Sequence, residues 1–198
     1  FAQLPVPNGA RELIARRVAK LVAAEKRLLE VASVIGRDFE FDILKAALEV
    51  EEDELLEAVD KLLKARILVD RRGFEDVLSF DQEKMRGVLL ADIPASERRV
   101  LHEKVARALE RRGESRLDDL VVRLAHHFTE AGLADKAMPY LPRAGERLEA
   151  GHLNEQAMKL YQSFLALLSR LGGDDREPWR ETSVGVKERL ARLLRLAG

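Results

Sequence analysis

Cysteine is absent from the 198-residue sequence, which excludes a disulfide framework, a thiolate metal site and a cysteine nucleophile. Long hydrophobic runs are absent too, since no stretch approaches the roughly 20 apolar residues that a membrane-spanning helix needs. Residues 1–5, Phe-Ala-Gln-Leu-Pro, contain neither an initiator methionine nor a signal-peptide pattern. We therefore expect a segment of a longer cytoplasmic protein, with no membrane part.

The sequence also lacks a dominant charge sign and the common catalytic motifs. A formal net charge of −1 removes the simplest argument for a nucleic-acid-binding domain, without excluding a local basic patch. Neither a Gly-x-x-x-x-Gly-Lys-Ser/Thr phosphate loop nor a Gly-x-Ser-x-Gly nucleophile elbow occurs. The adjacent His126 and His127 project about 100° apart on a helix, which favours one buried and one solvated imidazole over a shared metal. We predict no catalytic residue, no metal site and no enzymatic activity in this segment.

What is present is a hydrophobic fraction of 46%, enough for a core, and one especially informative stretch, Asp53–Leu89. In this stretch an amphipathic helix precedes two β-prone pieces, residues 67–70 and 77–80, which flank the turn Arg71-Arg72-Gly73. A helix followed by a hairpin with a glycine near its tip is typical of a winged helix-turn-helix. The predicted buried face of the helix consists of Leu55, Leu56, Val59, Leu62 and Leu63.

The residues before this stretch predict the helices on which it packs. One apolar helix face begins at Leu13, and a second helix starts near Ala24 and ends at Gly36, a residue suited to a helix C-terminus. Phe39 and Phe41 are expected to be core anchors that lead into a short helix. We assign residues 1–93 to a winged-helix domain.

Residues 94–198 are expected to form a helical-repeat domain. The segment 130–138 resembles the segment 149–158, and each contains a helix end, a glycine turn and a helix start with a small alanine. This pattern is typical of tetratricopeptide-like hairpins, in which alanine lets helices approach and an aromatic side chain fills the gap. Pro142 should kink the helix that contains it or delay its start. The candidate gap-filling and partner-binding residues are Tyr140, Tyr161 and Phe164.

The predicted fold is therefore mainly α: a winged helix-turn-helix with a small β-hairpin, followed by a tetratricopeptide-like array.

The helix before the hairpin would be the recognition helix that enters a DNA groove, and its charge argues against DNA binding. Residues 49–66 carry seven acidic and three basic side chains, a sum of −4, whereas DNA binding depends on neutralising phosphates. The acidic start also suits a helix N-terminus, where the macrodipole favours negative charge. Arg71 and Arg72 at the wing tip are the evidence on the other side.

Five segments, in this order, resemble those of one protein family: residues 14–18, 29–39, 80–86, 97–102, and 125–128 with Ala131-Gly132. They are similar to the segment behind the nucleotide-binding domain of bacterial signal-transduction ATPases with numerous domains. That family includes MalT-type and LuxR-type activators and regulators fused to adenylate cyclases or protein kinases. The resemblance spans residues 4–170.

The resemblance implies a winged helix that closes over ATP or ADP held by a preceding ATPase domain, then repeats that sense a ligand or a protein partner. This segment itself would hold no cofactor. In such proteins a histidine that contacts the nucleotide phosphates often follows the last wing strand. That position here is Gln82, which can donate a hydrogen bond but carries no charge. Arg86, one helical turn further on, either supplies positive charge to the nucleotide or is simply solvated.

Three functional hypotheses follow. The first is a non-catalytic regulatory segment that docks on the upstream nucleotide-binding domain of the same chain. The second is a DNA-binding transcription regulator that uses Arg71 and Arg72, and the third is a peptide-binding repeat scaffold lined by the aromatic residues named above. In the last helix, Arg189, Arg192 and Arg195 recur opposite the leucines, which predicts a solvated face. Those leucines are expected to pack on a further repeat or on a second copy.

Overall fold

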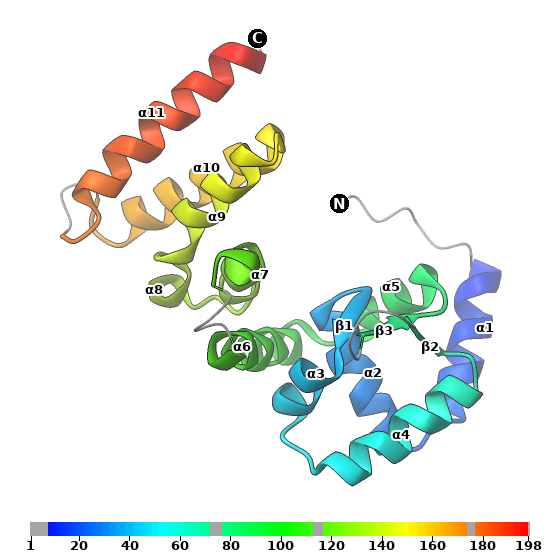
Figure 1. Ribbon diagram of the computed structural model, residues 1–198. Coiled ribbons are helices and arrows are strands. Elements are labelled where there is room, and N and C mark those ends of the chain that lie inside the picture. Colours follow the sequence, from blue (N-terminus) through cyan, green and yellow to red (C-terminus); the bar gives the residue numbers. More distant parts are fainter. Residues whose placement is uncertain (1–7, 72–76, 113–116, 174–176, 198) are drawn as a thin grey trace. The chain divides into compact units, whose positions relative to one another are not determined.

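The computed structural model describes residues 8–71, 77–112, 117–173 and 177–197 (Figure 1). The described chain is mainly α-helical, with a small three-stranded antiparallel sheet. It divides into two compact units, residues 1–108 and 109–198. The sequence placed this boundary earlier, at Asp92-Ile93-Pro94, where the structure shows a break between successive helices.

The first unit holds the sheet and the helices packed around it. The helices and both strands expected from the sequence are present, and one further strand, β1, was not predicted. The elements in chain order are α1 (Asn8–Ala19), α2 (Ala23–Ile35), β1 (Asp38–Glu40), α3 (Phe41–Leu48), α4 (Glu52–Lys64), β2 (Leu68–Asp70), β3 (Val77–Phe80), α5 (Glu83–Asp92) and α6 (Ala95–Arg112).

Gly36 ends α2, as predicted, and turns the chain into β1. Its φ of +153° lies where L side chains are rarely found, and its N–H donates to the Ala32 carbonyl at 3.1 Å. At the other end of α2, the Val22 N–H donates to Oε2 of Glu25 at 3.1 Å. Both ends of the helix therefore have backbone groups satisfied by local hydrogen bonds.

The sheet has the strand order β1-β3-β2, so strands that are distant in sequence are neighbours. Phe39 of β1 is paired with Leu78, and Leu68 of β2 is paired with Phe80. The rings of Phe39 and Phe80 are buried with their centroids 5.8 Å apart. Phe39 is thus a core anchor as predicted, whereas Phe41 is only half-buried.

The hairpin of β2 and β3 is closed by the N–H of Arg71, which donates to the Val77 carbonyl at 3.0 Å. Arg72 and Gly73, which were expected to form the turn, lie outside the described residues. The strands on either side agree with the sequence prediction to within one residue.

Helix α4 buries Leu55, Val59 and Leu62 at the i, i+4, i+7 spacing of one helix face. Each fully buried aliphatic side chain of this kind contributes about 1.5–3 kcal/mol. The prediction was wrong for Leu56, which is 48% exposed. A shift of one position rotates a side chain by about 100°, which takes Leu56 off the buried face.

Polar contacts join distant parts of the first unit. Nη2 of Arg17 in α1 donates to the carbonyls of Ala65 and Arg66, at 2.8 and 3.1 Å, just beyond the C-terminus of α4. Lys104 of α6 pairs with Glu49 at 2.6 Å. The start of α6 therefore belongs with this unit, which explains why the division falls later than the sequence suggested.

The second unit is entirely helical in its described residues. α9 packs against both α7 and α10, and α11 packs against α10. His127 of α7 is buried and His126 is exposed, as their adjacent positions predicted. The elements after α6 are α7 (Leu117–Glu130), α8 (Ala134–Ala137), α9 (Tyr140–Ala150), α10 (Asn154–Arg170) and α11 (Arg180–Ala197).

Pro142 explains why α8 and α9 are separate helices. α9 begins at Tyr140, so Pro142 falls in the first helical turn, where a backbone N–H has no partner within the helix. The expected delay of the helix start is thus confirmed. Further along α9, Gly145 is buried directly against the ring of Tyr161 in α10.

Candidate functional site

The start of α5 is the position to which the family resemblance gave a nucleotide-sensing role. Gln82 immediately precedes this helix, in extended conformation, and its carbonyl accepts a hydrogen bond from the Met85 N–H at 3.0 Å. Its side chain is exposed. Because the N-terminal end of a helix carries a partial positive charge, an exposed amide donor here suits an anionic group.

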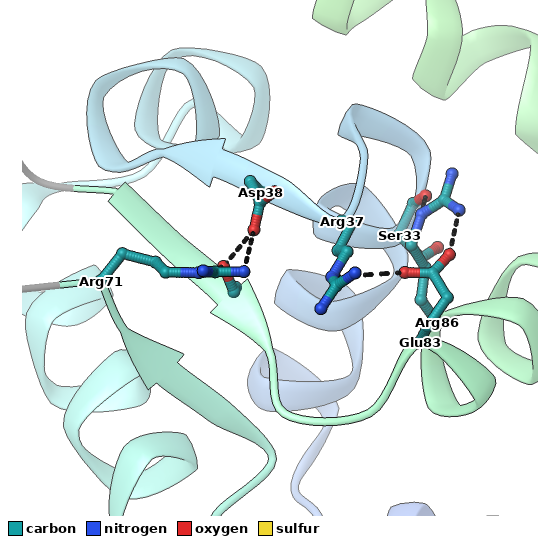
Figure 2. A network of polar contacts seen from close by, with 7 residues as sticks. Ser33, Arg37, Asp38, Arg71, Glu83 and Arg86 are labelled. Carbon is teal, nitrogen blue, oxygen red and sulfur yellow. Dashed lines mark hydrogen bonds and ion pairs between the residues drawn. The ribbon is translucent and has the colours of Figure 1, made fainter. Parts of the chain in front are cut away.

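Arg86 is not a freely solvated arginine on this helix. Its Nε donates to the Ser33 carbonyl at 3.1 Å and its Nη1 donates to Oε1 of Glu83 at 2.9 Å (Figure 2). Ser33 lies in the last turn of α2, so Arg86 caps a carbonyl that has no partner within that helix. The guanidinium is thereby held in one orientation, with its side chain 21% exposed.

Arg37 is a member of this site that sequence reasoning did not single out. It lies between Gly36 and β1, its side chain is 57% exposed, and its Nε is 4.0 Å from Oε2 of Glu83. Figure 2 shows Arg37 and Arg86 approaching Glu83 from different elements. The signal that could have found it is the Gly36-Arg37 pair, which places a cation directly after the end of a helix.

A second polar group lies along the sheet and includes Arg71. Asp38 and Ser79 are register partners in β1 and β3, and the Ser79 hydroxyl donates to Oδ1 of Asp38. Nε of Arg71 donates to the Ser79 hydroxyl at 3.0 Å, and its Nη2 is 3.4 Å from the same Asp38 oxygen (Figure 2). This candidate DNA contact is therefore already paired with a carboxylate. Arg72, the other candidate, lies outside the described residues.

The surface of α4 and its flanking residues is acidic. Each of the seven acidic and three basic side chains of residues 49–66 is exposed, so their sum of −4 faces solvent. Lys45 donates a hydrogen bond to Glu52 at 2.5 Å, and this bond raises the pKa of the lysine. The helix that would enter a DNA groove thus presents carboxylates to the phosphates.

The three aromatic residues predicted to bind a partner are largely buried in the second unit. Tyr161 and Phe164 are 0% exposed, so they fill space between helices. Tyr140 is half-buried and its ring is stacked on Phe128, with centroids 5.6 Å apart. Its hydroxyl donates to Glu110 at 2.8 Å, and burial together with this bond raises the pKa of Tyr140 to about 12. Partner binding through these rings stays a prediction.

Glu149 is a polar junction that the sequence did not reveal. It accepts hydrogen bonds from the Tyr161 hydroxyl at 3.0 Å and from Arg189 at 3.3 Å, and it also pairs with Arg192. Burial alone would raise the pKa of the Glu149 carboxyl, but the bonds from Tyr161 and Arg192 outweigh it and lower the pKa. Two arginines of α11 predicted to be solvated therefore tie α11 to α9.

Comparison with known proteins adds no assignment, since no protein-family model, curated protein or solved structure matches the chain. Among the described residues, no helix is both long and apolar enough to cross a membrane.

Proposed function

We propose that the chain is a non-catalytic regulatory and interaction segment of a cytoplasmic multidomain ATPase switch. The first unit would be a winged helix that docks on an upstream nucleotide-binding domain, and the second a tetratricopeptide-like array that receives a protein or small-ligand signal. The order α2-β1-α3-α4-β2-β3, with β1 beside β3, supports the winged-helix assignment. The close packing of α9 on α10 at Gly145, which lies directly against the Tyr161 ring, supports the repeat assignment.

The observation that carries this proposal is the exposed acidic surface of α4. Non-specific DNA affinity comes from cations that release counterions from phosphates, and seven exposed carboxylates against three cations oppose this. Arg71 offers little compensation because Asp38 already pairs with it. An acidic helix surface of this kind is suited to a protein partner instead.

The residues at the start of α5 fit the phosphates of ATP or ADP held by the neighbouring domain. Gln82 provides an exposed amide donor, and Arg86 provides a guanidinium held in place by the Ser33 carbonyl. The nucleotide would supply the anionic charge that distinguishes the states of the switch. The residues of this chain would sense that charge and change how the first unit docks.

A titration with a labelled mixed-sequence DNA duplex at low salt tests the proposal. We expect no binding at micromolar protein, where non-specific DNA binders usually show a shift. The matched positive control is Glu54→Lys/Glu57→Lys, which reverses two exposed charges of α4 and should gain salt-sensitive binding. Micromolar binding by the wild-type chain would overturn the proposal in favour of a DNA-binding regulator.

The natural reading frame upstream of Phe1 provides a second test. We expect a Gly-x-x-x-x-Gly-Lys-Ser/Thr phosphate loop within about two typical domain lengths. A reading frame without such a loop would rule out the ATPase switch but would not change the result of the DNA titration. The titration therefore tests whether this segment binds DNA, and the reading frame tests whether it belongs to an ATPase.

A further inference from the structure

The carboxylate of Glu83 is shared unequally between two arginines. It accepts a hydrogen bond from Arg86 at 2.9 Å but is 4.0 Å from Nε of Arg37, beyond hydrogen-bond distance. One carboxylate is thus ion-paired with two guanidiniums but accepts a hydrogen bond only from Arg86. All three side chains are partly exposed, so a ligand from solvent can reach them.

The guanidinium of Arg86 and the backbone of Arg37 are held in place independently of Glu83. Arg86 is held by the Ser33 carbonyl, and Arg37 directly follows Gly36, whose backbone N–H is bonded to α2. The backbone of Arg37 is also anchored, because its carbonyl accepts the N–H of Phe80 at 3.2 Å. Glu83 could therefore leave without displacing either backbone.

We propose that Arg37 and Arg86 form a binding site for a condensed phosphate, and that Glu83 is the internal counter-ion that this phosphate displaces. A di- or triphosphate carries several anionic oxygens on one chain, so it can hydrogen-bond to both guanidiniums at once, whereas the carboxylate of Glu83 hydrogen-bonds only to Arg86. This inference rests on the proposed function and adds to it a contact residue, Arg37, and a built-in competitor, Glu83.

Displacement of Glu83 gives the site a regulatory property. With Glu83 in place, Arg86 is hydrogen-bonded to the carboxylate, and Arg37 has only the longer ion pair of 4.0 Å. When the phosphate binds, Glu83 is released to solvent at the first position of α5, where the helix dipole still favours its charge. The released carboxylate costs little, so a modest phosphate affinity is enough to exchange the two anions.

Calorimetric titration of the whole chain with inorganic tripolyphosphate at low ionic strength tests the inference. Glu83→Gln removes the competitor and should bind tripolyphosphate about two- to fivefold more tightly than wild type, the range expected for an exposed ion pair. Glu57→Gln is the matched control, because it makes the same change in net charge on exposed α4 and should not alter the affinity. Thermal melting by circular dichroism checks that both variants are folded.

Adding Arg37→Gln to the Glu83→Gln variant tests whether Arg37 is the guanidinium that gives the tighter binding of tripolyphosphate. We expect the gain in affinity to be lost, since Arg37 is the guanidinium that has only the longer ion pair with the carboxylate. The inference is overturned if the double variant binds tripolyphosphate as tightly as Glu83→Gln does. It is also overturned if Glu83→Gln binds no more tightly than wild type, or if Glu57→Gln shows an equal gain in affinity. The DNA titration reports on the proposed function separately, so either failure can be recognised.

Discussion

Gly145 in α9 lies so close to the ring of Tyr161 in α10 that a Cβ at position 145 would overlap the ring. Gly145→Ala should therefore destabilise the second unit by about 1–3 kcal/mol, the usual cost of overpacking. Urea denaturation followed by circular dichroism measures this loss of unfolding free energy. In the control, Gly185→Ala in α11, the added Cβ meets nothing within 4 Å. The control should be neutral or stabilising by up to about 1 kcal/mol, through helix propensity.

The orientation of α4 predicts that alanine substitution of two of its leucines has very different effects on stability. Leu62 is 0% exposed and Leu56 is 48% exposed. Leu62→Ala should cost about 2–5 kcal/mol of unfolding free energy, because it leaves a cavity. Leu56→Ala should stay within about 0.5 kcal/mol of wild type. Comparable losses in the two variants would contradict the orientation of this helix.

Trp179 is the one tryptophan of the chain and reports on the docking of α11. Its ring contacts Phe164 of α10 edge-on, with centroids 6.1 Å apart. Glu149→Gln removes the charge that binds Arg189 and Arg192, which should cost about 1–3 kcal/mol and shift Trp179 fluorescence towards its solvent-exposed spectrum. Glu146→Gln is the control, because among the described residues its 50% exposed carboxylate is paired with Arg189 and not with Arg192. An identical response in both variants would remove Glu149 as the junction.

The same carboxylate predicts an acid-dependent stability. The pKa of Glu149 lies below its ordinary value of 4.5 in the folded protein. A group with a lowered folded-state pKa stabilises the protein above its unfolded pKa, and this stabilisation is lost as the pH falls through the folded pKa. The difference in unfolding free energy between wild type and Glu149→Gln should thus be largest near neutral pH and shrink below pH 4.5. A difference independent of pH would contradict this linkage.

Both tyrosines of the chain should resist ionisation in alkali. Burial and the bond to Glu110 raise the pKa of Tyr140 to about 12, and burial and the bond to Glu149 raise the pKa of Tyr161. A raised pKa stabilises the fold below the ordinary value of 10.0, and that stability is lost as the pH rises through the folded pKa. Near-ultraviolet absorbance should show no phenolate at pH 10.0. In Glu149→Gln, Tyr161 should ionise at lower pH than in wild type.

The sequence predicted those parts of the fold that depend on local patterns. β-prone residues on either side of a glycine turn identified β2 and β3, Gly36 marked the end of α2, and Pro142 marked a late helix start. β1 escaped prediction because three residues are too few for a periodic signal, and its pairing with β3 joins positions about forty residues apart. Strand assignment there depends on tertiary contact.

The site was predictable only in part, for a related reason. Gln82 was singled out through the family resemblance alone, and the partners of Arg86, Arg71 and Arg189 lie on other helices or strands. Without the three-dimensional contacts, such arginines are assigned to solvent or to an external anion. Only the folded arrangement shows that each of them already has a carboxylate or a carbonyl to bind.

The bond from Arg17 to the carbonyls beyond α4 sets a lower limit on the size of an autonomous fragment. A truncation that begins at α2 would keep every strand of the sheet, yet it would leave Ala65 and Arg66 without their guanidinium. Arg66 already adopts a positive φ of 51°, so the truncation would weaken the chain at a residue whose backbone conformation is strained. Expression boundaries drawn for biophysical work should therefore fall before Asn8.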